Sequence, residues 1–344
     1  MKKFLSLLTA LLLAASMLTA CGAAQTAETT AAIETTEIIE TTEATEAAEA
    51  VEIRGAALKG PTAMGLAQLI CQEDSGCRFQ ISASADEIVP LLIQGELDVA
   101  AIPANLASVV YNKTQGGIQV LGINTLGVLY VVETGDTIHT MADLKGKTLF
   151  ATGKGHTPEQ VLTYLLQENG LELGRDVTVE WKAEAAECLS ALAEAGDDVA
   201  LLPQPFVTVA MTKNENLRIA LDLTAQWEAV QADAETPSSM VTGVVVARKD
   251  FVEAHPQAVS DFMDRYRQSV DFVNANVEEA ALLIEELGIV KAPIARKAIP
   301  ACNIVFLEGA EMESRLSGYL EVLFNQNPKS VGGALPDSGF YFAR

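Results

Sequence analysis

Positively charged residues are scarce in this sequence of 344 residues. Only 23 Lys and Arg stand against 46 Asp and Glu, which gives a formal net charge of −23 at pH 7. No basic patch interrupts the negative charge, and a field of that sign repels a polyanion such as DNA or RNA. We therefore expect no nucleic-acid partner.

Residues and motifs typical of catalysis are also few. The chain has only 3 His, and of His139, His156 and His255 only His156 falls in a segment that we predict to face a binding site. The G-x-S-x-G, H-E-x-x-H and P-loop motifs are missing. These absences argue against an enzyme, and the sequence predicts no cofactor.

The cysteines lack the spacing of a metal site. Cys71 and Cys77 are six positions apart, and Cys188 and Cys302 are distant from them, which matches no zinc pattern. No metal is therefore expected. Outside the cell, Cys71 and Cys77 could form a disulfide that closes a small loop; the alternative is that these residues are buried or unreactive thiols.

Only one apolar run approaches the length of a membrane span, and it lies at the N-terminus. Two lysines precede the apolar stretch 4–18, which is too short for an ordinary span, and Leu-Thr-Ala-Cys-Gly ends it. This pattern resembles a bacterial lipoprotein signal, covering residues 1–21, in which Cys21 is lipidated and becomes the mature N-terminus. An ordinary secretory signal with an incidental cysteine, or an uncleaved anchor, is the alternative.

Residues 22–51 have the composition of an acidic tether. Among Ala and Thr, and without Lys or Arg, glutamates recur every three or six residues: Glu28, Glu34, Glu37, Glu40, Glu43, Glu46 and Glu49. Such a repeat builds no apolar stripe, and like charges at close spacing repel each other. We expect a solvated spacer that reaches roughly 30 Å and holds a globular body off a membrane.

The remaining chain contains an internal repeat. The stretch E-I-V-P-L-L-I-Q-G-E-L-D-V-A-A-I-P from Glu87 matches E-C-L-S-A-L-A-E-A-G-D-D-V-A-L-L-P from Glu187 at an offset of 100 residues. Each copy reads as a helix, a glycine, an Asp, a buried strand and a proline. A second pair of helices begins near Thr62 and Thr157, and the latter opens a capping-box pattern with Pro at the first helical position.

These repeats predict an α/β fold of two lobes. Strands alternating with helices indicate mostly parallel sheets flanked by helices. The predicted strands are 54–58, 78–82, 97–102 and 118–123 in the first lobe and 147–151, 177–181, 198–202 and 217–221 in the second. Two crossings, at 122–127 and near 242–243, would form a two-strand hinge. Lobe 1 would comprise residues 52–126 plus 244–344, and lobe 2 residues 127–243.

Ligands of open α/β sheets bind beyond the carboxyl ends of the strands, where helix N-termini present unpaired N–H groups. The loops at these ends should therefore converge on one cleft that suits a carboxylate, a sulfonate or another polar oxygen group. The candidate ligand-binding residues are Gly60, Pro61, Thr62, Ala63, Met64, Asn105, Thr125, Gly155, His156, Thr157, Gln204 and Phe206.

Several of these candidates also have simpler roles. Thr62 and Thr157 could serve only as helix caps, and His156 as an exposed loop residue. Met64 and Phe206 belong to the core unless the cleft reaches them. The prediction of a binding site depends on four loops, two from each of the duplicated lobes, that converge on one cleft. None of the loops contains an Arg, although Arg54 and Arg248, in or beside strands, could reach the cleft and pair with a sulfonate or carboxylate.

Five motifs, in this order, resemble the extracytoplasmic solute-binding proteins of ABC importers, in the nitrate/sulfonate/taurine and thiamine-precursor group. They are K-G-P-T-A-M-G-L-A-Q-L at Lys59, L-I-Q-G-E-L-D-V-A-A-I-P at Leu92, M-A-D-L-K-G-K-T at Met141, D-F-V-E-A-H-P-Q-A-V at Asp250 and L-P-D-S-G-F-Y-F at Leu335. The similarity covers almost all of the range 53–342.

This resemblance implies a type 2 periplasmic-binding-protein fold that closes on one small-molecule ligand. The ligand would then pass to a membrane permease driven by a cytoplasmic ATPase, and the protein would be a monomer held on the outer face of the cell membrane by its lipid alone. Two alternatives remain open at this stage. One is a ligand-sensing lipoprotein, and the other is an enzyme of the same fold, of the pyrimidine-precursor type.

Overall fold

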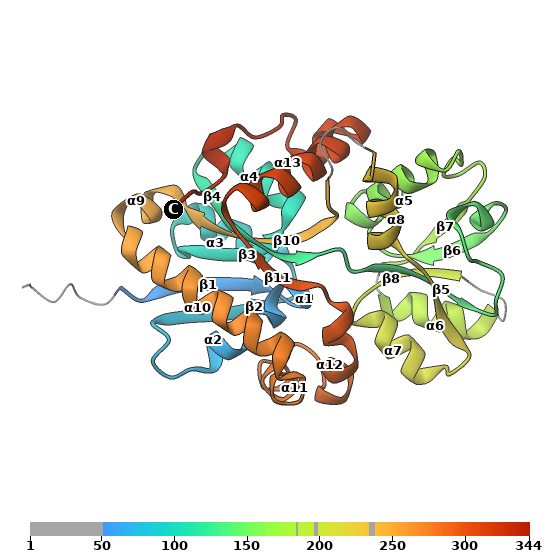
Figure 1. Ribbon diagram of the computed structural model, residues 1–344, viewed down its shortest axis with the longest axis horizontal. Coiled ribbons are helices and arrows are strands. Elements are labelled where there is room, and N and C mark those ends of the chain that lie inside the picture. The colour runs from blue at the N-terminus through green and yellow to red at the C-terminus, as the bar shows by residue number, and fades with distance from the viewer. Residues whose placement is uncertain (1–50, 184, 196–198, 234–237) are drawn as a thin grey trace, which may run out of the picture. The chain divides into compact units, whose positions relative to one another are not determined.

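Two β-sheets organise the part of the chain that the structure, a computed structural model, describes: residues 51–183, 185–195, 199–233 and 238–344. The predicted signal peptide with Cys21 and nearly all of the tether lie outside the described residues. Residues 49–344 form one compact unit. In Figure 1 the two sheets lie next to each other within it, with helices on both faces of each.

The first half of the described chain runs through β1 (Ile53–Leu58), α1 (Pro61–Met64), α2 (Ala67–Cys71), β2 (Cys77–Ser82), α3 (Ala85–Gln94), β3 (Val99–Pro103), α4 (Ala104–Lys113), β4 (Ile118–Leu126), β5 (Leu129–Thr134), η1 (Met141–Leu144), β6 (Thr148–Ala151), α5 (Thr157–Glu168) and β7 (Thr178–Trp181). The second half runs through α6 (Ala185–Ala195), β8 (Val199–Pro203), α7 (Phe206–Lys213), β9 (Leu217–Asp222), α8 (Leu223–Gln231), β10 (Val241–Arg248), α9 (Lys249–Ala254), α10 (Pro256–Ala275), α11 (Val277–Glu286), α12 (Ala292–Ala298), η2 (Ile299–Ala301), β11 (Ile304–Leu307), α13 (Gly309–Gln326), η3 (Pro328–Val331) and η4 (Ser338–Phe340).

The strand order shows the duplication directly. The six-stranded sheet, which with its helices we call lobe 1, has the order β11-β4-β10-β3-β1-β2, and the five-stranded sheet of lobe 2 has the order β7-β6-β8-β5-β9. Read from β2 and from β7, the first five strands correspond one to one. This confirms the predicted α/β fold of two lobes, whereas the residue ranges assigned to each lobe remain a prediction.

One strand of each sheet comes from the other side of the hinge. The chain leaves lobe 1 along β4 and enters lobe 2 as β5, which pairs antiparallel with β8 and β9. It returns as β10, which pairs antiparallel with β3 and β4. The sequence predicted both crossings but not their place in the sheets, since apolar patterning does not identify a strand's neighbours.

Alternating side chains of the strands separate three apolar layers. Along β3, Val99 and Ala101 face α10, α11 and α12, whereas Ala100 and Ile102 face the opposite side. In lobe 2, Tyr130 and Val132 of β5 point to a third cluster with residues of α6 and α7. The C-terminal helices α10 and α11 pack on the sheet of lobe 1.

The helix α13 packs on both lobes. Its buried residues share one apolar cluster with strands of lobe 1 and with α5 of lobe 2. The Tyr319 ring lies 5.5 Å from the ring of Trp227, and Gln326 Nε2 donates to Gln167 Oε1 at 2.8 Å. Arg315 also donates to the Ser239 hydroxyl at 2.7 Å. Figure 1 shows α13 above the two crossing strands.

Two predicted helix starts were wrong in detail. The helix expected from Thr62 is interrupted at Gly65, and its N-cap is Gly60, whose φ of 129° suits glycine. In α5 the N-cap is His156, and the predicted capping box of Thr157 does not form. The side chain of Glu159 instead accepts a hydrogen bond from the Gly155 N–H at 2.5 Å. This leaves the Thr157 hydroxyl available for another contact.

The four cysteines of the described part are free thiols. The structure therefore contains no disulfide between Cys71 and Cys77. Burial raises the pKa of Cys77 and of Cys188 to about 11, and that of Cys302 to about 12. Thiols of such high pKa are poor nucleophiles.

A buried carboxylate closes the end of lobe 1 that is remote from lobe 2. Asp98, which is 2% exposed, accepts hydrogen bonds from the Arg54 backbone N–H at 3.0 Å and from its Nη2 at 2.6 Å. Arg248 Nη2 lies 3.4 Å away. Burial opposes ionisation of Asp98, but the hydrogen bonds and charges of the two arginines outweigh it, so its pKa lies below the ordinary value of 3.8.

Because this pKa is depressed in the folded protein, Asp98 stabilises the fold above pH 3.8, and this contribution is lost as the pH falls further. We expect Asp98→Asn to lower the free energy of unfolding near neutral pH by about 1–3 kcal/mol. Denaturant unfolding at several pH values measures this, and the difference from wild type should shrink in acid. Asp250→Asn, which removes the exposed partner of Arg248, is the control and should have little effect. Equal losses in both variants would contradict the assignment.

The return crossing depends on a glycine. A Cβ at Gly243 of β10 would lie 2.5 Å from Asn124 Oδ1 and 3.0 Å from Thr62 Oγ1. Asn124 is 1% exposed and donates to the Thr62 carbonyl at 3.3 Å, so it has no free space to move into.

We expect Gly243→Ala to destabilise the protein by about 1–3 kcal/mol, which thermal or denaturant unfolding would detect. Adding Asn124→Ala removes the clashing oxygen, so the double variant should lose less than the sum of the two single variants. Additive losses would show that the contact does not limit this position.

Candidate functional site

A cavity of about 460 Å³ lies between the lobes at the carboxyl ends of their strands. Both lobes contribute to its wall, and the residues that line it are Leu58, Thr62, Ser84, Ala85, Asp86, Pro103, Asn105, Leu106, Val128, Leu129, His156, Thr157, Pro158, Pro203 and Thr242. The wall is mainly apolar, with hydroxyl and amide groups at a few positions. Such a cavity can enclose most of a small organic molecule.

Three helices of eight or more residues begin at this cavity. Ser84 is the N-cap of α3 and accepts from the Asp86 N–H at 3.1 Å, while Asn105 lies in the first turn of α4 and Thr157 begins α5. The first turn of a helix leaves N–H groups without intrahelical partners and carries partial positive charge. The cavity can therefore bind a polar oxygen group through the backbone.

Asn105 and Thr157 connect the lobes across the cavity. The Thr157 hydroxyl lies 3.4 Å from Asn105 Oδ1, and Asn105 Nδ2 donates to the Ser330 carbonyl at 3.2 Å. The second bond fixes the orientation of the amide, so its oxygen faces lobe 2. Tyr319 of α13 lies behind this pair. Its buried hydroxyl makes no hydrogen bond within the described residues, and burial raises its pKa while the neighbouring Thr157 lowers it.

The structure brings four of the predicted site residues to the cavity: Thr62, Asn105, His156 and Thr157. Thr62 and Asn105 come from lobe 1, and the other two from the start of α5 in lobe 2. Thr62 is 5% exposed, whereas the His156 side chain is exposed at the edge. That these residues bind a ligand remains a prediction.

The other predicted residues of lobe 1 lie outside the cavity wall. Ala63 and Met64 are fully buried in the core beneath α10. Thr125 is also fully buried, and its hydroxyl donates to Asn124 Oδ1 at 3.0 Å. Gly60 and Pro61 form the turn before Thr62 and are partly exposed. These five positions belong to the core, to the crossing strand β4 and to the turn before Thr62.

Three predicted residues of lobe 2 also lie outside the wall. Gly155 is exposed and bonded to Glu159. Gln204 is 3% exposed, and its Oε1 accepts from the Thr208 hydroxyl at 2.8 Å, so its amide is engaged within lobe 2. Phe206 is 38% exposed at the start of α7. The neighbouring Pro203 occupies the wall in their place.

Sequence reasoning missed two polar parts of the cavity wall. One is Ser84 and Asp86 at the start of α3, and the other is Thr242 of β10. The sequence does contain a signal for the start of α3. The segment S-A-D-E at Ser84 follows a predicted strand and has the capping-box spacing, which together indicate a helix start at the carboxyl end of a strand. Thr242 could be found only from the crossing near it.

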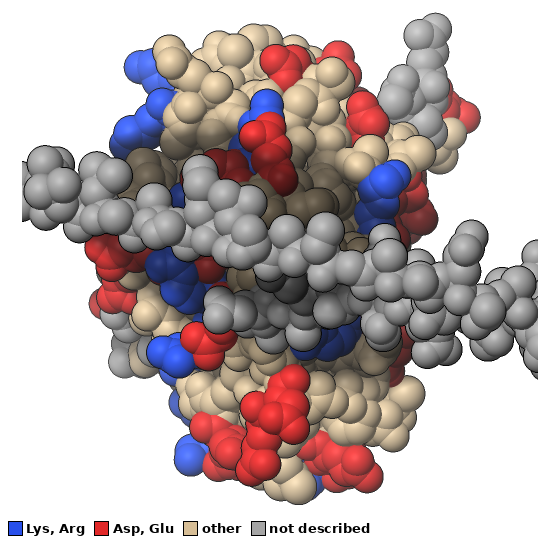
Figure 2. Space-filling model, turned by 90° about the vertical axis from the view of Figure 1, so that its left-hand side faces the viewer, with Lys and Arg blue, Asp and Glu red and all other residues tan. Residues whose placement is uncertain are grey.

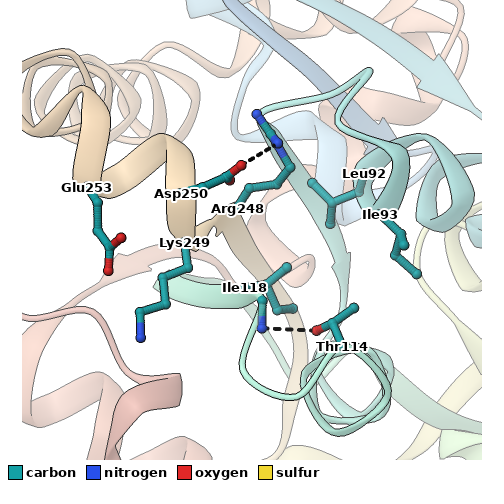
Figure 3. A pocket seen from close by; sticks show the side chains of 9 residues that line it. Leu92, Ile93, Thr114, Ile118, Arg248, Lys249, Asp250 and Glu253 are labelled. Carbon is teal, nitrogen blue, oxygen red and sulfur yellow. Dashed lines mark hydrogen bonds and ion pairs between the residues drawn. The ribbon is translucent and has the colours of Figure 1, made fainter.

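Arg54 and Arg248 do not reach the cavity, because both are bonded to Asp98 at the amino ends of β1 and β3. A hollow of about 360 Å³ lies near them, lined by residues such as Arg248, Lys249, Asp250 and Glu253. Figure 3 shows Asp250 turned toward Arg248. Only lobe 1 contributes to this hollow. Figure 2, which views the molecule from the lobe 1 end, shows basic and acidic side chains interspersed on that face. Closure of the lobes cannot enclose a ligand there.

The described residues contain no group of three or more His, Cys, Asp or Glu arranged to hold a metal ion. Among the helices of the described ranges, none combines the length and apolar character needed to cross a membrane.

Comparison with known proteins identifies the family. Residues 68–295, more than half of the chain, match the family described as ABC transporter, phosphonate, periplasmic substrate-binding protein. The chain belongs to this family. It is therefore an extracytoplasmic substrate-binding protein of an ABC transporter, which the resemblance had implied, whereas the nitrate/sulfonate/taurine or thiamine-precursor assignment is not confirmed. No curated protein matches the sequence.

Solved structures show the same fold for this substrate-binding protein. An ABC transporter protein from Parabacteroides distasonis is 26% identical, with 86% of this chain and 99% of that chain covered and a TM-score of 0.71. The periplasmic aliphatic sulphonate binding protein SsuA from Escherichia coli is 17% identical, with 85% and 92% covered and a TM-score of 0.66. The alkanesulfonate-binding SsuA from Xanthomonas axonopodis, bound to MOPS, is 14% identical, with 83% and 95% covered and a TM-score of 0.58.

An experiment can distinguish the roles of the two amide side chains that the sequence suggested for the site, Asn105 and Gln204. Asn105→Ala should weaken binding of a solute tenfold or more, about 1.4 kcal/mol, and should lower stability less than Gln204→Ala because Asn105 is only partly buried. Gln204→Ala should leave the affinity unchanged but lower the melting temperature, because it breaks a buried bond to Thr208. Calorimetric titration and thermal unfolding of both variants measure the two effects. A loss of affinity confined to Gln204→Ala would move the site deeper into lobe 2.

Proposed function

We propose that this protein is the lipid-anchored substrate-binding component of an ABC importer, which closes its lobes on a small organic or oxyanion solute and delivers it to the permease. The observation that carries the proposal is the cavity between the lobes, whose wall includes Asn105 from one lobe and Thr157 from the other, 3.4 Å apart. A solute that contacts both residues favours the closed arrangement, so binding and closure are linked.

The helix N-termini give the proposed binding mode. Backbone N–H groups at the starts of α4 and α5 would bind an oxygen group of the solute, and Asn105, Thr157 and Thr62 would orient it. The apolar wall formed by residues such as Leu58, Leu106 and Leu129 would enclose its carbon skeleton. Nitrate, sulfonate, taurine and thiamine-pyrimidine compounds are the solute classes we consider, with phosphonates added by the family and sulfonates supported by the SsuA neighbours.

The proposed membrane attachment is supported by the sequence alone. The signal pattern ending at Cys21 and the acidic segment 22–51 support a lipid anchor followed by a spacer. With one lipid and a hydrated tether, the body would stay within reach of the permease without entering the bilayer. We propose that it acts as a monomer on the outer face of the cell membrane.

Solute binding is the first part to test. A ligand present at 100 times its dissociation constant adds about 2.7 kcal/mol of stability, a readable rise in melting temperature. We expect such a rise for one solute class in a panel of phosphonates, sulfonates, amino acids, pyrimidines and aromatic acids. A panel without any rise would contradict a solute-binding role for these classes.

Delivery is tested with the permease and its ATPase reconstituted in proteoliposomes. The protein with its bound solute should raise ATP hydrolysis several-fold over the same protein with Asn105→Ala at equal concentration. Binding without any stimulation would favour a sensing lipoprotein over an importer component.

A further inference from the structure

The charges around the cavity do not suit a phosphonate group alone. Among its described lining residues there is no Lys or Arg, and the charged or titratable side chains are Asp86 and His156. A guanidinium or ammonium group is the usual protein partner of a phosphonate or sulfonate. A purely anionic solute would meet backbone dipoles, hydroxyl groups and an amide here but no Lys or Arg among the described lining residues, and it would approach a chain of strongly negative net charge past the carboxylate of Asp86.

Asp86 has an unused carboxylate. It lies in the first turn of α3, is exposed, and lines the cavity. Its backbone N–H bonds to Ser84, but its carboxylate makes no hydrogen bond or ion pair within the described residues. Its neighbour Glu87 is also an exposed acid of the same helical turn, and it does not line the cavity.

The sheet order indicates the approximate spacing between this carboxylate and the polar centre of the site, Asn105 and Thr157. Asn105 follows β3 and Asp86 follows β2, and β1 lies between these two strands. Neighbouring strands are about 4.8 Å apart, so the two positions are separated by roughly 10 Å along the edge of the sheet. Leu58, at the end of β1, lies between them, and Val128 and Leu129 line the same cavity from the side of lobe 2.

We infer that the solute is an elongated amine: an ammonium group binds Asp86, an apolar chain lies against Leu58, and an oxygen-bearing group binds at Asn105 and Thr157. This inference rests on the proposed function and narrows its solute class. An amine removes the conflict between Asp86 and a negatively charged end group, because the two charges of the solute then face different parts of the cavity. The volume of about 460 Å³ is ample for a chain of this length.

The test uses a pair of probes that differ only in the amine, 6-aminohexanoate and hexanoate. Calorimetric titration and melting temperature are measured with the full-length protein in detergent. We expect 6-aminohexanoate to bind at least tenfold more tightly than hexanoate. The short amines taurine and 2-aminoethylphosphonate should bind more weakly than 6-aminohexanoate because they cannot span both positions.

Asp86→Asn and Glu87→Gln form a matched pair of variants. Both remove one negative charge from the first turn of α3, so their effects on the helix dipole are comparable. Asp86→Asn should abolish the advantage of 6-aminohexanoate over hexanoate, whereas Glu87→Gln should preserve it.

Three results would overturn the inference. They are equal affinities for the two probes, equal effects of the two variants, and no binding of any amine probe at millimolar concentration. The importer role would survive these results if a phosphonate or sulfonate without an amine binds tightly and Asp86→Asn leaves its affinity unchanged. Failure of every solute in the wider panel would instead count against the proposed function itself.

Discussion

Backbone pairing of the two crossing strands holds the rest of this structure together. β5 lies between β8 and β9, and β10 lies between β3 and β4, so each sheet has an interior strand supplied from across the hinge. An interior strand satisfies its N–H and C=O groups on both edges and cannot leave without exposing them. The lobes are therefore joined through their sheets, and the orientation of the helix N-termini at the cavity follows from that pairing.

Much of this fold could be predicted because the sequence contains an internal repeat, so each lobe supports the interpretation of the other. The offset of 100 residues located α3 and α6 and the strands after them, and the predicted strands agree with β1 and β3 within two residues at either end. The places of β5 and β10 could not be predicted. Their sequences are apolar on both faces, as interior strands are, and such a run does not specify which strands it pairs with.

The site was predictable to the extent that it depends on strand ends. Thr62, Asn105 and Thr157 follow strands whose limits the apolar pattern gives well. Side-chain direction was not predictable, since it depends on tertiary packing: Met64 turns into the core beneath α10, and Gln204 turns to Thr208 within its own lobe. Asp86 follows β2, and the identical positions of the repeat at Glu87 and Glu187 lie in the helices after β2 and β7, so the repeat marks the helix but not the carboxylate that reaches the cavity.

The described residues that line the cavity include no Lys or Arg, so we propose that this substrate-binding protein binds the oxygen group of a polar solute through helix starts and neutral side chains. Helix starts supply positive potential that needs no counter-ion and cannot be displaced by rotamer changes. Hydroxyl and amide groups add direction rather than charge. In the proposed binding mode, the selectivity of this member depends on the few side chains around the helix starts.

The position of α13 limits how the lobes can separate. A hinge of two strands permits rotation in any direction that the strands can bend, but α13 is attached to α4 through η3 at one side and rests on α5 and Trp227 at the other. Rotation of lobe 2 must then slide the apolar surfaces of α5 and α13 along each other. Opening would combine hinge bending with shear, and the distance that two packed helices can slide sets how wide the mouth becomes.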